Sequence, residues 1–278
     1  MFSSPPPPLE APLSPCRLPA YRGPTDEELE WIERELFRSG VAVRSYRVDM
    51  EEFRRFKEAF PFGDTYYGGP GNPVYEEKLL EHFVCYDLGI LHMGGRREIY
   101  VDVASADSPW VYLLRKKGCK AFAIDAKPPD VHLQWYYRTM DATRTSFADG
   151  SVACASLQCA FEMFAGDDDR KLVRELGRIL RKGGRAIICP LYLHTHYCGY
   201  CSPEYADRTE YHDPDAVLYV ESRYPGIPFS RKYDPVRLKE RILSTVSASG
   251  MEYNLYVLRN RTEVDTGSYC HFILEIRR

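Results

Sequence analysis

Apolar residues recur at helical spacing through the first third of the chain. This pattern predicts three helices, over 25–39, 50–60 and 74–91. Thr25 followed by an acidic turn is typical of a helix start, and Gly40 is typical of a helix end. We therefore expect a helical cap over 25–95, preceded by a disordered proline-rich tail over 1–24.

From residue 96 onward, short β-branched runs alternate with helical patterns. Five runs predict strands, at 99–104, 121–125, 135–141, 152–157 and 184–192. The helical patterns cover 108–117, 168–181 and 234–249. Two last runs, 252–259 and 269–277, predict a closing antiparallel pair. Such alternation is typical of a parallel sheet with helices on both faces, so we expect a seven-stranded, mostly parallel α/β domain over 96–278.

One segment inside this domain, residues 193–232, has neither helical nor strand periodicity. It is rich in His, Cys, Tyr and Pro, and it directly follows the fifth predicted strand. We interpret it as an insertion in the α/β domain.

Composition and charge argue against several classes of protein. The chain has 278 residues and a net charge of −3, which gives no general attraction to nucleic acid or an anionic membrane. No apolar run approaches the roughly 20 residues of a membrane span. Most of the nine cysteines lie in apolar runs, which favours a reducing cytoplasm over a disulfide framework. We therefore expect a cytoplasmic protein without nucleic-acid or membrane partners.

The stretch from Glu98 to Asp125 predicts a nucleotide-binding unit. Its pattern is strand, tight turn, helix and strand, with Asp102 near the end of the first strand and Asp125 closing the second. A helix N-terminus after such a turn offers free N–H groups, and an acid at a strand end can accept both hydroxyls of a ribose. This pattern favours a cofactor that contains adenosine.

Three later segments are similar to blocks of a known family in their order and spacing. They are Met140–Val152 with its Phe-Ala-Asp-Gly-Ser-Val stretch, Ala155–Phe164, and Leu172–Ile188 with its Lys-Gly-Gly turn. Together, residues 98–192 resemble class I S-adenosylmethionine-dependent methyltransferases. The resemblance implies a Rossmann-like fold and S-adenosyl-L-methionine as cofactor.

The first motif departs from the family pattern. The family usually has D-x-G-x-G-x-G, whereas this chain has Asp102-Val-Ala-Ser-Ala-Asp-Ser108, without glycine. Glycine allows positive φ and close backbone approach, and Ala and Ser are the next smallest residues. We expect the turn to survive with an altered path, with Ser108 as N-cap and Pro109 in the first helical position.

The resemblance also implies roles for individual residues. The expected cofactor-binding residues are Asp102, Ala104, Ser105, Ala106, Asp125, Ala126, Asp141, Ala142 and Gln158. Asp125 would hold the ribose hydroxyls, and Asp141 with Ala142 would meet the adenine. Tyr66 and Tyr67 lie in the predicted cap, which in this family often closes over the cofactor; the alternative is that they anchor the cap.

On the acceptor side, His194 and His196 follow the fifth strand and are the candidate catalytic bases. Expected substrate contacts are Glu162, Tyr192 and Tyr197. The run from His194 to Cys201 also has zinc-ligand types, with Cys198 and Cys201 as a C-x2-C pair. A second such pair is absent, so we assign no metal site.

The leading functional hypothesis is methyl transfer from S-adenosylmethionine to oxygen or nitrogen of a small-molecule acceptor. The alternative is a non-catalytic, methyltransferase-like module whose insertion binds a partner protein, which the altered first motif would favour. The acids at Asp102, Asp125 and Asp141 favour the enzyme.

Overall fold

The computed structural model describes residues 17–18, 21–127, 135–208 and 212–278, so most of the predicted proline-rich tail lies outside the described residues. The chain divides into two compact units. Unit 1 comprises Met1–Val43, Glu162–Arg170 and Tyr192–Thr245, and unit 2 comprises Arg44–Phe161, Lys171–Leu191 and Val246–Arg278. Each unit is assembled from separate stretches of the chain, so the domain boundaries expected at 24 and 95 stay a prediction.

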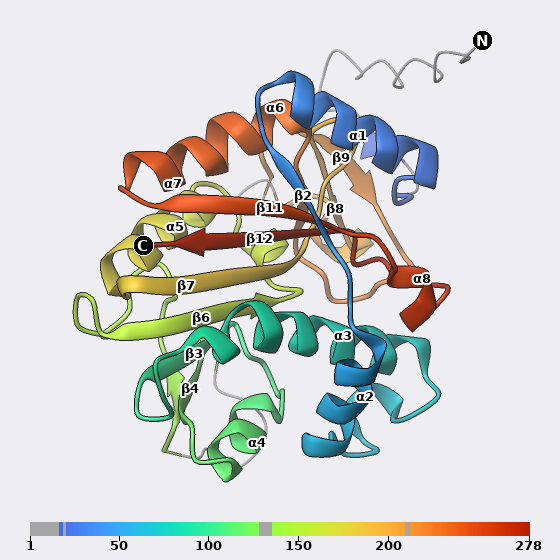
Figure 1. Cartoon of the computed structure of the whole chain (residues 1–278). Coiled ribbons are helices and arrows are strands. Elements are labelled where there is room, and N and C mark those ends of the chain that lie inside the picture. The colour runs from blue at the N-terminus through green and yellow to red at the C-terminus, as the bar shows by residue number, and fades with distance from the viewer. Residues whose placement is uncertain (1–16, 19–20, 128–134, 209–211) are drawn as a thin grey trace. The chain divides into compact units, whose positions relative to one another are not determined.

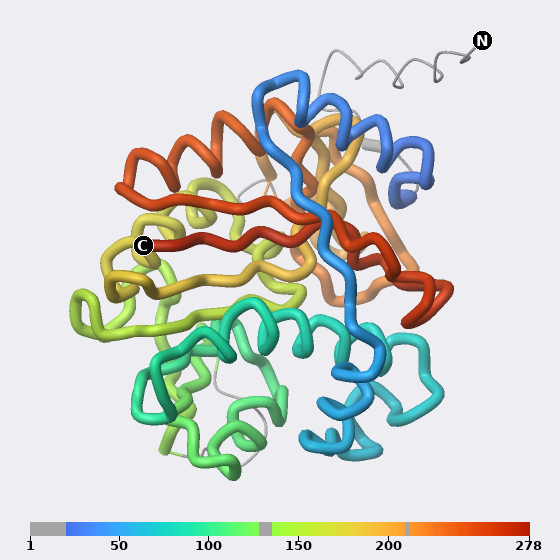
Figure 2. Tube along the Cα trace, in the orientation of Figure 1, coloured from blue at the N-terminus to red at the C-terminus, as the bar shows by residue number. Residues whose placement is uncertain are grey.

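Unit 2 is built on a sheet whose strands lie in the order β2-β11-β12-β7-β6-β3-β4-β5 (Figure 1). The strands are β2 (Val43–Tyr46), β3 (Ile99–Val103), β4 (Lys120–Asp125), β5 (Tyr137–Thr139), β6 (Val152–Gln158), β7 (Leu180–Leu191), β11 (Glu252–Leu258) and β12 (Phe272–Arg277). From β5 to β7 all neighbours are parallel. The closing hairpin of β11 and β12 is antiparallel, as its trace in Figure 2 shows.

The sequence predicted this mostly parallel α/β sheet correctly, with one strand missed. The sheet has eight strands rather than seven because β2 adds to its edge, next to β11. The missed strand is four residues long and lies between two strong helical patterns, within the segment predicted to be a helical cap. So short a run gives too little alternation to be recognised.

Helices flank the sheet, and all of the following except the last overlap a helix predicted from the sequence. They are α2 (Met50–Ala59), α3 (Pro73–Leu88), α4 (Trp110–Lys116), α5 (Asp168–Ile179), α7 (Ser244–Ala248) and α8 (Arg261–Val264). Short 3-10 turns lie at Tyr66–Gly68, Ile90–His92 and Phe161–Met163. The start of α4 differs from the prediction: the helix begins at Trp110 with Pro109, not Ser108, as its N-cap, and the Trp110 N–H donates to Ser108 Oγ at 3.3 Å. None of the helices in the described part of the chain has the length and apolar composition of a membrane crossing.

A cluster of aromatic rings joins α2 to the sheet. Trp110 is fully buried, and its ring centroid lies 5.6 Å from that of Phe56 and 5.0 Å from that of Phe60. Its indole N–H donates to the hydroxyl of Tyr100 on β3 at 2.9 Å. The amphipathic face of α2 therefore packs onto the α/β core of unit 2 through one tryptophan.

Unit 1 contains a second sheet in the order β1-β9-β8-β10. Its strands are β1 (Arg17–Leu18), β8 (Cys198–Cys201), β9 (Val217–Val220) and β10 (Ser230–Lys232). Its helices are α1 (Asp26–Arg38), with the expected capping box at Thr25, a 3-10 turn at Pro203–Tyr205, and α6 (Pro235–Arg237), continued by a π-helical stretch over Leu238–Leu243. Three of the strands lie in the predicted insertion, where they are too short to give a sequence period.

A buried arginine organises unit 1. Arg231 on β10 is fully buried, with its guanidinium 2.6 Å from the carboxylate of Asp169 and 2.7 Å from that of Asp213. It also donates to the backbone carbonyls of Phe164 and Gly166. One cation therefore ties three separate stretches of the chain together.

Replacing Arg231 should be costly, because the buried Asp213 would lose its ion pair, while Asp169 would keep its pair with Arg241. We expect Arg231→Met to lower the free energy of unfolding by about 3–5 kcal/mol, the usual cost of breaking a buried ion pair from one side. The control Arg54→Ala, which removes exposed pairs with Glu51 and Glu58, should cost at most about 1 kcal/mol. Urea denaturation followed by circular dichroism measures both, and equal effects would contradict the assignment.

Candidate functional site

The predicted acids meet at one edge of the sheet of unit 2. Asp102 lies one residue before the end of β3, Asp125 closes the parallel neighbour β4, and Gln158 closes β6 on the other side of β3. Parallel strands end at the same edge, where ligands of this type of sheet bind. The structure thus brings these three predicted cofactor residues together.

The turn after β3 keeps a left-handed backbone without glycine. Ala104 has a φ of 54° and Ala106 a φ of 45°, at the two positions where the family motif has its first two glycines. The Ser105 N–H donates to the Ile124 carbonyl at 3.1 Å, and the Ala106 N–H donates to Asp125 Oδ2 at 3.0 Å. The turn therefore keeps the conformation that the motif requires, at a cost of about 1–2 kcal/mol per strained residue.

Asp102 lies buried beneath this turn. Its Oδ2 accepts a hydrogen bond from Ser105 Oγ at 2.7 Å, while Oδ1 has no hydrogen-bond partner among the described residues. Burial raises the pKa of Asp102 to about 7, because the charged form loses its hydration. An unsatisfied buried oxygen is a position where a bound ligand can donate a hydrogen bond.

Of the predicted cofactor residues, Ala126, Asp141 and Ala142 lie in loops of unit 2, whereas Asp125 ends β4. Asp125 Oδ1 accepts the Lys127 N–H at 3.1 Å, and Asp141 Oδ1 accepts both the N–H and the hydroxyl of Thr143 at 2.8 Å. Ala126 is exposed, whereas Ala142 is buried beside Asp141. Each carboxylate keeps an exposed side and further lone pairs, so both can accept hydrogen bonds from a ligand.

Tyr66 and Tyr67 differ in how they are packed and in how far they are exposed. Tyr66 packs with its ring centroid 5.1 Å from that of Phe62, and its hydroxyl lies 2.9 Å from His82 Nε2. Tyr67 is 49% exposed and has a φ of 44°. Tyr66 therefore anchors the loop to α3, as the alternative interpretation proposed, and its contact with the cofactor stays a prediction, as does that of Tyr67.

Helix α3 carries a buried polar cluster that the sequence interpretation missed. Lys78 Nζ lies 2.9 and 3.0 Å from the two carboxylate oxygens of Glu81, and both side chains are buried. His82, also buried, lies 3.4 Å from Ser108 Oγ in the turn before α4. Tyr269 donates to Glu81 Oε1 at 3.1 Å. We call Lys78, Glu81, His82 and Tyr269 the α3 cluster.

Burial and neighbouring charges shift the pKa values of two residues in the α3 cluster. Burial lowers the pKa of His82 to about 3, so its imidazole is neutral near pH 7. Burial also lowers the pKa of Lys78, but the neighbouring Glu81 more than offsets this, and the pKa lies well above its ordinary value. The sequence does contain a signal for this cluster. Glu77-Lys78 and Glu81-His82 stand four residues apart in an otherwise apolar helix, and a solvent-exposed face does not explain polar residues there.

The predicted catalytic and substrate residues all belong to unit 1, whereas the cofactor residues belong to unit 2. They are His194, His196, Glu162, Tyr192 and Tyr197. Both histidines are buried, and burial lowers the pKa of His194 to about 4 and also lowers that of His196. Their roles as bases stay predictions, and a pKa near 4 makes His194 a weaker proton acceptor than a free histidine.

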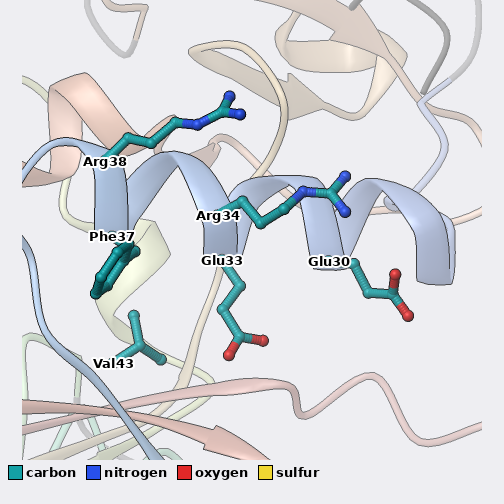
Figure 3. A pocket seen from close by; sticks show the side chains of 6 residues that line it. All are labelled: Glu30, Glu33, Arg34, Phe37, Arg38 and Val43. Carbon is teal, nitrogen blue, oxygen red and sulfur yellow. The ribbon is translucent and has the colours of Figure 1, made fainter. Parts of the chain in front are cut away.

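A groove runs along α1 in unit 1. Figure 3 shows Phe37 and Val43 at one end of it, with charged side chains along the helix. Its lining residues are Glu30, Glu33, Arg34, Phe37, Arg38 and Val43. Two acidic and two basic side chains line it, and Phe37 is 76% exposed, so the groove has neither a uniform charge nor an enclosed apolar floor. We assign it no ligand.

Comparison with known proteins identifies the class of the sheet segment. Residues 101–188 match a family model described as a methyltransferase domain. The match runs from β3 into β7 and includes Asp102, Asp125, Asp141 and Gln158. This segment is a methyltransferase domain, which confirms the resemblance to class I S-adenosylmethionine-dependent methyltransferases and supports S-adenosyl-L-methionine as cofactor.

Solved structures resemble the chain at low identity. Geranyl diphosphate C-methyltransferase from Streptomyces coelicolor A3(2) is 14% identical, with 92% of this chain and 100% of that chain covered and a TM-score of 0.44. The 1,6-didemethyltoxoflavin-N1-methyltransferase from Burkholderia thailandensis is 12% identical, with 93% of each chain covered and a TM-score of 0.46. No curated protein matches the sequence.

Glycine at the strained turn should stabilise the protein. In Ala104→Gly, the relief of left-handed strain outweighs the extra entropy of glycine in the unfolded chain, so we expect the free energy of unfolding to rise by about 0.5–1 kcal/mol. The control Ala155→Gly, at a buried position of β6, should lower it by about 1 kcal/mol. Thermal or urea unfolding measures the difference. A loss of stability in Ala104→Gly would show that the turn is not strained.

Proposed function

We propose that this protein transfers a methyl group from S-adenosylmethionine to an oxygen or nitrogen atom of a small-molecule acceptor. The observation that carries the proposal is the left-handed Ala104–Ala106 turn, closed by the carboxylate of Asp125. A chain that had lost the cofactor would have no reason to keep two strained alanines at the glycine positions of the motif. The methyltransferase family match over the same strands supports this interpretation.

The residues present fit the cofactor. Asp125 would hold the ribose hydroxyls, Asp141 and Ala142 would flank the adenine, and the turn from Asp102 to Ala106 would pass beneath the methionine part. The bound cofactor supplies a methyl group activated by its sulfonium. The chain then has to align the acceptor with that methyl and exclude water.

We assign the acceptor side to the α3 cluster. It lies in the same unit as the cofactor residues and approaches their loop through the 3.4 Å contact between His82 and Ser108. Lys78 offers a positive charge for an anionic or polar acceptor, and Glu81 fixes its position. Lys78, Glu81 and His82 are buried, which suits a small molecule better than a macromolecule, and the net charge of −3 argues in the same direction.

Calorimetric titration with S-adenosylmethionine and S-adenosylhomocysteine tests cofactor binding. Asp125→Ala should weaken binding at least about 10-fold, because each of the two ribose hydrogen bonds to this charged group contributes about 1.5–3 kcal/mol. The control Asp149→Ala removes an exposed carboxylate of the same unit and should bind like the parent. If the folded parent does not bind, the partner-binding module becomes the better hypothesis; if Asp125→Ala binds unchanged, our placement of the ribose is wrong.

The acceptor assignment needs a variant that keeps the fold. Lys78→Met combined with Glu81→Leu removes both charges together, which avoids leaving one buried charge unpaired. We expect the cofactor dissociation constant to stay within about twofold, while methylation of an acceptor found by mass-spectrometric screening falls about 10²-fold. The matched control is Lys57→Met with Glu76→Leu, a more exposed pair that also includes a residue of α3. Equal turnover in the two double variants would contradict the assignment.

A further inference from the structure

Two histidines and a cysteine of unit 1 come together where the chain leads into β8. His194, His196 and Cys198 are every second residue of this segment, which bends at Thr195 and His196. Their ligand atoms all lie within 4.8 Å of one another. All three side chains are buried.

The surroundings of the two imidazoles match those of metal ligands. His194 Nε2 lies 3.3 Å from the backbone carbonyl of Arg22, an acceptor, so that nitrogen carries the proton and Nδ1 keeps its lone pair. His196 Nε2 lies 3.0 Å from the Tyr219 hydroxyl. In metal sites, a carbonyl or hydroxyl on the outer nitrogen commonly orients the ring in this way.

A single hydroxyl lies close to the Nδ1 atoms of both imidazole rings. Thr195 Oγ1 lies 3.2 Å from Nδ1 of His194 and 3.2 Å from Nδ1 of His196. One hydroxyl has one hydrogen, so it can satisfy only one of the two lone pairs at a time.

We propose that His194, His196 and Cys198 bind a zinc ion, with water or an added ligand in the fourth position. Two imidazoles and one thiolate form a borderline-soft donor set that suits Zn²⁺. Binding forms one sulfur–metal bond, and the thiol proton goes to solvent. Three protein ligands with an open fourth position are the arrangement of catalytic rather than closed structural zinc sites.

The grouping differs from the C-x2-C pair visible in the sequence. Cys201 is three residues beyond Cys198, so its side chain points to the opposite face of β8, and it does not belong to the cluster. The ligand types are already visible in the sequence, but its spacing pairs the two cysteines. The structure pairs one cysteine with two histidines two and four residues before it.

Metal titration of the full chain tests the proposal. We would strip the protein with a chelator, then titrate it with Zn²⁺ against a chromophoric competitor and separately with Co²⁺. The parent should bind one equivalent of Zn²⁺ and show a thiolate-to-cobalt absorption band. Cys198→Ser should lose the band and bind Zn²⁺ more than about 100-fold more weakly, since loss of an outer-shell partner alone costs roughly 10–100-fold.

Cys201→Ser is the matched control, because Cys201 is equally buried on the same strand. It should keep one equivalent of Zn²⁺ and the cobalt band. His194→Gln gives a second ligand variant in case Cys198→Ser does not fold, which circular dichroism shows. The proposal is overturned if the parent binds no zinc, or if the folded ligand variants and Cys201→Ser bind equally well, which would indicate adventitious binding only.

Discussion

The turn after β3 is the constraint on which unit 2 depends. Its left-handed residues, Ala104 and Ala106, reverse the chain at the edge where β3, β4 and β6 end. Hydrogen bonds from Ser105 to Ile124 and from Ala106 to Asp125 hold this reversal against its steric cost. The turn then directs the chain into α4, so it also places Trp110 at the centre of the aromatic cluster.

Two buried polar features of unit 2 lower its stability. Asp102 is buried with an unsatisfied oxygen, and the Lys78–Glu81 pair is buried within α3, although apolar residues in both places would cost less. Natural proteins tolerate such local conflicts mainly at functional sites. Both conflicts are therefore consistent with the sites proposed above for the cofactor and the acceptor.

Unit 1 depends on a different kind of constraint. Its strands are three or four residues long, or only two in β1, so backbone pairing alone contributes little to its stability. Buried polar contacts hold the unit together instead. Arg231 joins Asp169 and Asp213, and the edge-to-face pair of His194 and His196 contacts Arg22 and Tyr219. A metal ion at the second of these places would add a crosslink of the same kind.

The sequence determined the elements whose causes are local. The capping box at Thr25, the strand runs around Asp102 and Asp125, and the closing antiparallel pair could all be read from spacing and residue type, and the order of the motifs indicated the methyltransferase class. Tertiary structure decided what depends on distant neighbours. Strand β2 exists because β11 offers it an edge. Lys78 and Glu81 are buried because the fold encloses α3. The ligand atoms of His194, His196 and Cys198 lie within 4.8 Å of one another because of the local path of the chain, which a segment without periodicity cannot reveal.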